Sequence, residues 1–213
     1  MGETFDVDYF LNGPATGKSN YTDYRWLENR TVPMASRLAS HLKMRVGDSL
    51  LDFGCARGYY VKALRFLGYK AWGYDISTWA VENCDPDVKE FLTNHWEKLP
   101  QTMHHGLAKD CLEHVLAADL RRTIRMIASK VQRSLVVVVP LATVPGGDYV
   151  ADTDNSDVTH VTRQPLEGWL NILHDALDDD YPAIIHGSYH IPGLKEAATK
   201  HPRSCGFFTV DFL

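Results

Sequence analysis

Short apolar runs alternate with helical stretches along the chain. Residues 50–53 and 71–74 are short and apolar, and between them residues 60–66 place their apolar positions at helical spacing. The pattern returns further on, where residues 116–132 have the spacing of a long amphipathic helix and residues 135–139 form the most strongly β-branched run. Strands that alternate with helices predict an α/β fold built on a mostly parallel sheet.

Weaker patterns complete this arrangement. Further strands are predicted at residues 88–93, 105–109, 183–191 and 206–212. Further helices are predicted at residues 33–43, 78–83, 166–177 and 194–200. Residues 141–165 show no clear element. Loops of that length in a compact domain are usually functional or partly disordered, and this one is expected over the carboxyl edge of the sheet, where substrates bind.

Composition fits one compact domain. The 213 residues, 45% of them hydrophobic, suffice for a single core, and a net charge of −5 without a run of lysine or arginine disfavours a nucleic-acid partner. Neither a signal peptide nor a membrane-spanning apolar run is visible. The cysteines are scattered without C-x-x-C spacing, which indicates reduced thiols and a cytoplasmic location. They are Cys55, Cys84, Cys111 and Cys205.

The turn after the first strand predicts a nucleoside-binding site. Gly54 and Gly58 let the backbone turn tightly and approach a ligand, and Asp75 follows at the end of the second strand, where a ribose would lie. The spacing is not the G-x-G-x-x-G of dinucleotide folds. Asp52 would also repel a pyrophosphate and attract a cation instead. These two features disfavour an NAD-dependent oxidoreductase.

The run LDFGCARG, residues 51–58, resembles the LDxGCGxG motif of class I methyltransferases that use S-adenosylmethionine (SAM). Ala56 stands in place of the middle glycine. The resemblance implies a three-layer Rossmann-like fold, with a mostly parallel seven-stranded sheet of order 3-2-1-4-5-7-6 and helices on both faces. It also implies SAM as the cofactor and S-adenosylhomocysteine (SAH) as the product. The cofactor-binding residues that it implies are Asp52, Gly54, Cys55, Ala56, Gly58, Asp75, Ile76, His95, Trp96 and Asp110.

Within that set the adenine contacts are the least typical. Related methyltransferases carry an acid where His95 stands here, so the backbone or Asn94 is an alternative partner for the adenine amino group. Trp96 offers a flat apolar face for the ring. Packing of Trp96 in the core beneath the loop is the alternative.

Two segments carry candidate catalytic residues. The run DCLEHV, residues 110–115, resembles the xxLEHV segment of small-molecule, lipid and sugar methyltransferases, which implies that Asp110 faces the cofactor. Glu113 and His114 are candidates for proton transfer, or else start the following helix. In the long loop, His160 is the first candidate for a general base, with Asp157 as its orienting acid. A structural hydrogen-bonding role is the alternative for His160.

The chain before the first strand is expected to be an accessory segment. Residues 1–45 are predicted to form a strap and helix, and residues 46–213 the SAM-binding domain. The stretch SNYTDYRW, residues 19–26, resembles a segment of phage and bacterial methyltransferases of undefined substrate. As a polar and aromatic segment, it either covers the cofactor mouth or packs on the outer helices.

Together these features predict a SAM-dependent methyltransferase acting on an oxygen or nitrogen atom of a small molecule or a glycan sugar. The alternatives are a nucleic-acid or protein methyltransferase and a non-catalytic protein that binds SAM or SAH. No metal site is predicted, because the aspartates of residues 152–157 fit no particular ligand set. No membrane association is expected, and the oligomeric state is left open.

Overall fold

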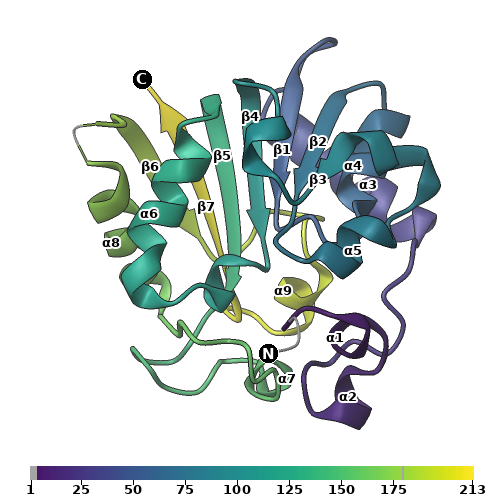
Figure 1. Ribbon diagram of the computed structural model, residues 1–213. Coiled ribbons are helices and arrows are strands. Elements are labelled where there is room, and N and C mark those ends of the chain that lie inside the picture. Colours follow the sequence, from purple (N-terminus) through teal and green to yellow (C-terminus); the bar gives the residue numbers. More distant parts are fainter. Residues whose placement is uncertain (1–3, 179) are drawn as a thin grey trace.

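The computed structural model describes residues 4–178 and 180–213, and in it the strands form one sheet (Figure 1). The strand order is β3-β2-β1-β4-β5-β7-β6, with β7 antiparallel to β5 and β6 and the other pairs parallel, which confirms the predicted order. The strands are β1 (Ser49–Phe53), β2 (Lys70–Tyr74), β3 (Leu92–Thr93), β4 (Met103–Lys109), β5 (Val131–Pro140), β6 (Ala183–Ser188) and β7 (Cys205–Phe212).

Helices cover both faces of this sheet (Figure 1). The longer ones are α3 (Glu28–His41), α4 (Tyr59–Phe66), α6 (Ala117–Ala128) and α8 (Leu166–Leu177). The short ones are α1 (Val7–Leu11), α2 (Gly13–Thr16), α5 (Thr78–Glu82), α7 (Asp152–Asn155) and α9 (Glu196–Lys200), and the 3₁₀ turns are η1 (Pro86–Phe91), η2 (Trp96–Lys98) and η3 (Leu112–His114). None of the helices in the described part of the chain combines the length and apolar character needed to cross a membrane.

Neighbouring residues on each central strand enter different cores. Leu50 of β1 packs in the cluster that holds Leu38 of α3, whereas Leu51 packs in the cluster that holds Trp169 of α8. Side chains alternate across a strand, so a continuous apolar run fills the space under the helices of both faces. This explains why the central strands read as unbroken hydrophobic runs.

Several predicted elements have other bounds in the structure, and two of these differences have a clear cause. The strand predicted at residues 88–93 is mostly the turn η1, because Asp85 caps it by accepting from the Asp87 amide and Pro86 starts it. The helix predicted at residues 116–132 ends at Ala128, and Val131 instead begins β5 by pairing with Met103 of β4.

The predicted accessory segment is divided in the structure. Its first residues, 1–3, lie outside the described residues. Helix α3 belongs to the main fold, since Ala35 and Leu38 are fully buried against the sheet. Only the part before α3, with the short helices α1 and α2, lies apart from the sheet (Figure 1).

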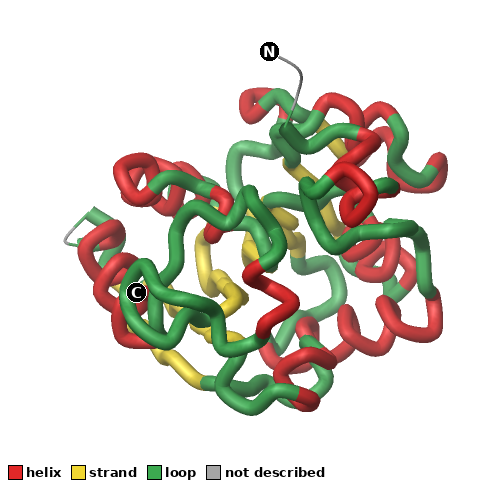
Figure 2. Tube along the Cα trace, turned by 90° about the horizontal axis from the view of Figure 1, so that it is seen from below, coloured by secondary structure: helices red, strands yellow, loops and turns green. Residues whose placement is uncertain are grey.

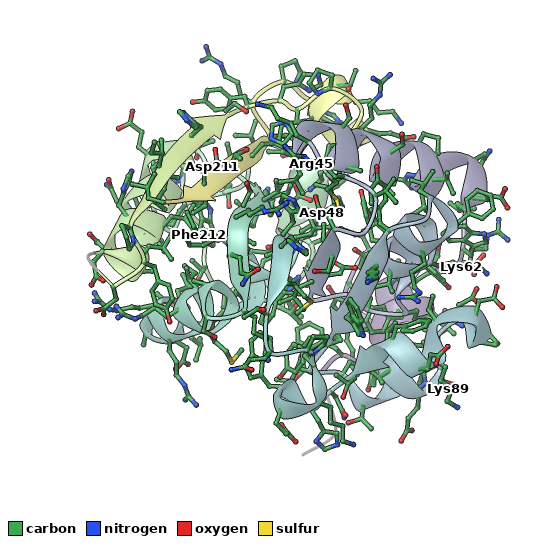
Figure 3. The ribbon with its side chains drawn as sticks, turned by 90° about the horizontal axis from the view of Figure 1, so that it is seen from above. Arg45, Asp48, Lys62, Lys89, Asp211 and Phe212 are labelled. Carbon is green, nitrogen blue, oxygen red and sulfur yellow. The ribbon has the colours of Figure 1, made fainter. Side chains whose placement is uncertain are left out.

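The two ends of the sheet are built differently. At the carboxyl ends of the parallel strands, loops and the short helices α1, α2, α7 and α9 come together (Figures 1 and 2). Arg45 and Asp48 lie at the opposite end (Figure 3). There Asp48 accepts from the Arg45 amide at 2.8 Å and from Arg133 at 3.0 Å. The first end therefore has the loops that a ligand site needs, whereas the second carries an ion pair between the buried Asp48 and the half-exposed Arg133.

Candidate cofactor and acceptor site

The turn after β1 depends on glycine at two positions. Gly54 and Gly58 both have φ of +77°, a region that favours glycine. A Cβ on Gly54 would lie 2.5 Å from Cβ of Cys111, and one on Gly58 would lie 2.5 Å from Leu92. Ala56, between them, has φ of +49° and packs its methyl group in a small cluster with the N-terminal segment. Of the three positions that are glycine in the motif, only the middle one thus tolerates a side chain here.

Asp75 holds this turn from the end of β2. One carboxylate oxygen accepts from the Ala56 amide at 2.6 Å, and the other accepts from the Ser77 amide at 2.8 Å. The side chain is buried. The acid that the sequence assigns to the ribose is therefore already oriented by the backbone on both sides.

Asp52 lies near the end of β1, close to the Asp75 carboxylate. Burial, and secondarily the nearby Asp75 carboxylate, raise the pKa of Asp52 to about 7, while Lys109 acts in the opposite direction. A carboxyl group in such a place is stabilised in its charged form by a bound cation. The ammonium or sulfonium of SAM is a cation of this kind.

A cavity of about 740 Å³ opens in front of these residues, within the range of roughly 300–1,000 Å³ usual for small-ligand sites. Seven of the ten predicted cofactor-binding residues line it: Asp52, Gly54, Cys55, Ala56, Asp75, Ile76 and Asp110. Gly58, His95 and Trp96 do not. The glycine turn and the two strand ends therefore meet at one cavity, and that these residues bind the cofactor stays a prediction.

His95 and Trp96 lie outside the cavity. The His95 side chain is 54% exposed and faces Glu97 at the surface. Trp96 packs edge-on against Tyr74, with ring centroids 5.2 Å apart, and against Phe53 at 6.1 Å. This is the core packing considered as the alternative for Trp96. Their adenine-binding role stays a prediction that their placement does not support.

Asp110 lines the cavity but its charge is already paired. It lies between the ammonium groups of Lys109 and Lys195, the second at 2.5 Å. Burial alone would raise the pKa of Asp110, and the two lysines outweigh it and lower the pKa below its usual value. Lys195 was not anticipated, because it lies 85 positions further along the chain and belongs to no motif.

The segment of residues 4–27, here called the strap, bridges the cavity. On the cofactor side, Ser77 donates to the Phe5 carbonyl at 2.5 Å and Arg57 donates to the Tyr24 carbonyl at 3.0 Å. On the side of the long loop, the Tyr9 hydroxyl donates to Asp157 at 3.1 Å. Aromatic strap residues line the cavity between these anchors, among them Phe5, Tyr9, Phe10, Tyr21 and Tyr24. The strap therefore lies at the cavity, and that it covers a bound cofactor stays a prediction.

The three predicted catalytic residues come together beside the cavity. The amides of Val161 and Thr162 each donate to the Glu113 carbonyl at 3.0 Å, which holds the long loop against η3. As a result the His114 and His160 rings lie 4.8 Å apart, and Nε2 of His160 lies 4.0 Å from the Glu113 carboxylate.

The predicted pair of His160 and Asp157 is close but not hydrogen-bonded. Nε2 of His160 is 3.8 Å from Asp157, whose oxygens instead accept from Thr159 and Tyr9. His114, not His160, lines the cavity. Burial, and secondarily the neighbouring His160, lower the pKa of His114 to about 4, so its imidazole is neutral near pH 7.

The fold resembles solved methyltransferase structures. A chain of the complex between the Haloferax volcanii Trm112 methyltransferase activator and a methyltransferase has a TM-score of 0.61 and 17% identity, covering 86% of this chain and 91% of that one. Burkholderia thailandensis 1,6-didemethyltoxoflavin-N1-methyltransferase, solved with 1,6-didemethyltoxoflavin and SAH, has a TM-score of 0.60 and 14% identity. The match covers 87% of this chain and 79% of that one. A SAM-dependent methyltransferase from Archaeoglobus fulgidus has a TM-score of 0.57 and 16% identity, and the match covers 85% of this chain and 94% of that one. At such identities the likeness concerns the fold.

The sequence comparisons identify the family. No curated protein matches this sequence. A family model described as a methyltransferase domain matches residues 26–179, well over half of the chain. With the glycine turn, the two carboxylates and the strand order described above, this match shows that the chain belongs to the methyltransferase-domain family and is a class I methyltransferase that uses SAM.

Proposed function

We propose that this protein transfers the methyl group of SAM to an oxygen or nitrogen atom of a small molecule or of a glycan sugar. The observation that carries the proposal is the position of His114. It stands on the cavity wall with a neutral imidazole, and Glu113 and His160 lie directly behind it. A methyl acceptor next to His114 would share one cavity with a cofactor bound at Asp52 and Asp75.

The methyl group of SAM needs no further activation by the protein. The sulfonium already activates the methyl carbon, so the chain supplies position and excludes water. An oxygen or nitrogen acceptor must also lose a proton. Glu113, His114 and His160 are proposed as the group that activates the acceptor, since these titratable side chains meet where the acceptor would lie.

The strap supports a small acceptor. It is anchored to the cofactor side through Ser77 and Arg57 and to the long loop through Asp157, so it crosses the mouth of the cavity. A flat macromolecular surface would have to displace these contacts to reach His114. A small molecule would need only a local opening.

The first test is calorimetric titration with SAM, SAH and NAD. Binding of SAM and SAH, weakened in Asp52→Asn and unchanged in the surface control Lys89→Ala, is expected. NAD binding in their place would contradict the proposed cofactor site.

The second test transfers a labelled methyl group from SAM to panels of phenols, sugars and amines, with RNA, DNA and proteins in parallel. We expect label in the small-molecule panels. Label found only in a macromolecule would contradict the proposed acceptor class. Tight SAM binding without transfer to any panel would favour the non-catalytic alternative.

A final comparison uses His114→Gln. Because His114 meets the acceptor and not the adenosyl moiety, kcat should fall about 100-fold or more while the affinity for SAH stays within a few-fold of wild type. An unchanged kcat would remove His114 from the proposed role.

A further inference from the structure

Glu113, His114 and His160 form a cluster with the composition of a metal site. Each of the three side chains offers one potential ligand atom, and these three atoms all lie within 4.8 Å of one another. Across the residues that the structure describes, no other group of three such side chains is this close. We propose that these residues hold one divalent transition-metal ion at the acceptor end of the cavity.

An unpartnered carboxylate oxygen points to the same place. Glu113 is 1% exposed, and its Oε2 has no hydrogen-bond partner within the described part of the chain. Buried polar atoms in native proteins are nearly always satisfied, by protein, water or an ion. A metal ion bound by the Glu113 carboxylate would satisfy this oxygen.

Both imidazoles are oriented as metal ligands usually are. Nδ1 of His160 lies 3.0 Å from the Asp154 carbonyl, and Nδ1 of His114 lies 2.8 Å from the Thr159 hydroxyl and 3.3 Å from its carbonyl. A carbonyl oxygen accepts a hydrogen bond, so the proton belongs on Nδ1 in both rings and Nε2 carries the lone pair. Metal-bound histidines typically donate their second N–H to such an oxygen.

The spacing fits an ion after a small adjustment. Metal–ligand bonds of about 2.1 Å place the ligand atoms of a tetrahedral site about 3.4 Å apart. The three ligand atoms lie within 4.8 Å of one another, and Nε2 of His160 is 4.0 Å from Oε1 of Glu113. Side-chain rotations that move each atom by less than about an ångström would therefore close the site. Two imidazoles and a carboxylate suit zinc, iron, cobalt or manganese and leave coordination positions open.

A second cluster of an acid with two histidines differs in its charge balance, although both ring nitrogens of its His105 also lack hydrogen-bond partners among the described residues. Asp48 lies near His104 and His105 at the opposite end of the sheet, 3.9 and 3.6 Å from their Nε2 atoms. There Arg133 already supplies a positive charge at 3.0 Å. In contrast, no lysine or arginine forms an ion pair with Glu113 among the described residues.

The ion would bind an acceptor that presents an oxygen atom, namely a hydroxyl or two adjacent oxygens. This assignment of the acceptor rests on the proposed function, whereas the binding of the ion does not. The ion would polarise the acceptor hydroxyl, whose proton passes to water. The oxygen lone pair then forms the bond to the methyl carbon, and the electrons of the carbon–sulfur bond remain on sulfur, which gives SAH.

The experiment measures metal binding without any acceptor. The full chain, stripped with a chelator, is titrated with Co²⁺ and followed by visible absorption, and the bound metal is counted by elemental analysis. Wild type should bind one ion per chain. His160→Ala and Glu113→Gln should weaken binding about 100-fold or more, and the control His201→Ala, at an exposed position outside the proposed sites, should not. SAH titration of each variant verifies that the cofactor half is intact.

Two results would overturn the proposal. One is the absence of saturable binding in a wild-type protein that binds SAH, or binding that persists in both variants. The other is a cobalt–thiolate charge-transfer band, which would place the ion on a cysteine such as Cys111. If one ion binds as expected but no methyl transfer is found, the proposed function fails and the metal site stands. Methyl transfer without metal binding would support the proposed function and overturn the metal site.

Discussion

The Asp75 carboxylate accepts a hydrogen bond from the Ala56 amide across 2.6 Å, which ties the glycine turn to the end of β2. The other oxygen of Asp75 accepts from the amide of Ser77, the residue that caps the start of α5. A ribose would therefore meet a carboxylate whose position is set before binding. Such preorganisation lowers the entropy that binding costs.

Asp75→Asn should damage both stability and cofactor binding. The new side chain has an NH₂ group where a carboxylate oxygen now accepts from a backbone amide, so one buried donor loses its partner. We expect a loss of about 1–3 kcal/mol in the free energy of unfolding and a fall of at least about tenfold in SAH affinity. Urea unfolding and calorimetry measure the two effects, with Glu97→Gln as the exposed control. Wild-type SAH affinity in Asp75→Asn would contradict the ribose assignment.

Asp52 should make the unliganded protein less stable as pH rises. The carboxyl ionises near 3.8 in the unfolded chain but at about 7 in the folded one, so the folded state binds more protons between these values. Stability falls across this window, and the full cost is present above about pH 7. Asp52→Asn should remove this dependence and raise the free energy of unfolding at about pH 8 by a few kcal/mol.

The same group should couple SAM binding to pH. A bound cation favours ionised Asp52, so SAM affinity should rise as pH increases through about 7, with release of a proton on binding below that value. Calorimetry in buffers of different ionisation enthalpy measures this release. The dependence should vanish in Asp52→Asn, and its persistence there would assign it to another group.

Phe10 should hold the strap over the cavity. It is 4% exposed, and its ring stacks on Trp79 with centroids 5.5 Å apart. Phe10→Ala should lower the free energy of unfolding by about 3 kcal/mol and speed SAH dissociation, because the strap loses a buried apolar anchor. Stopped-flow fluorescence measures the dissociation rate. Val46→Ala, at a site 98% exposed, is the control. Unchanged dissociation would mean that the strap does not close the site.

Asp48 should matter for stability alone. Burial would raise its pKa, but the hydrogen bond from the Arg45 amide and the charge of Arg133 outweigh it and lower the pKa. Asp48 therefore stabilises the fold above the unfolded pKa, and this contribution is lost as pH falls through the lower folded value. Asp48→Asn should cost about 1–3 kcal/mol near pH 7 and leave SAH affinity unchanged, since the residue lies at the far end of the sheet (Figure 3). A parallel loss of SAH affinity would show that the two ends are coupled.

Much of the fold could be read from local patterns. Buried parallel strands need unbroken apolar runs and tight turns need glycine, so residues 50–53 and 135–139 and the turn at Gly54 were predicted. The strand predicted at residues 88–93 failed because Asp85 and Pro86 favour a helical turn over the weak apolar run that follows. The placement of Trp96 away from the cavity could not be predicted for a different reason. An aromatic residue beside a ligand loop has the same local pattern whether it faces the ligand or the core.

The sequence by itself determined the part of the predicted cofactor site that comes before β3. Its residues lie in one βαβ unit, where Asp52, Gly54, Ala56 and Asp75 are placed by local geometry alone. Only the tertiary structure decided the acceptor half. Lys195 reaches Asp110 across 85 positions, the strap meets Asp157 across 148, and His160 meets Glu113 through pairing of the long loop with η3. Such contacts follow from how the whole chain packs, and no periodicity or short motif encodes them.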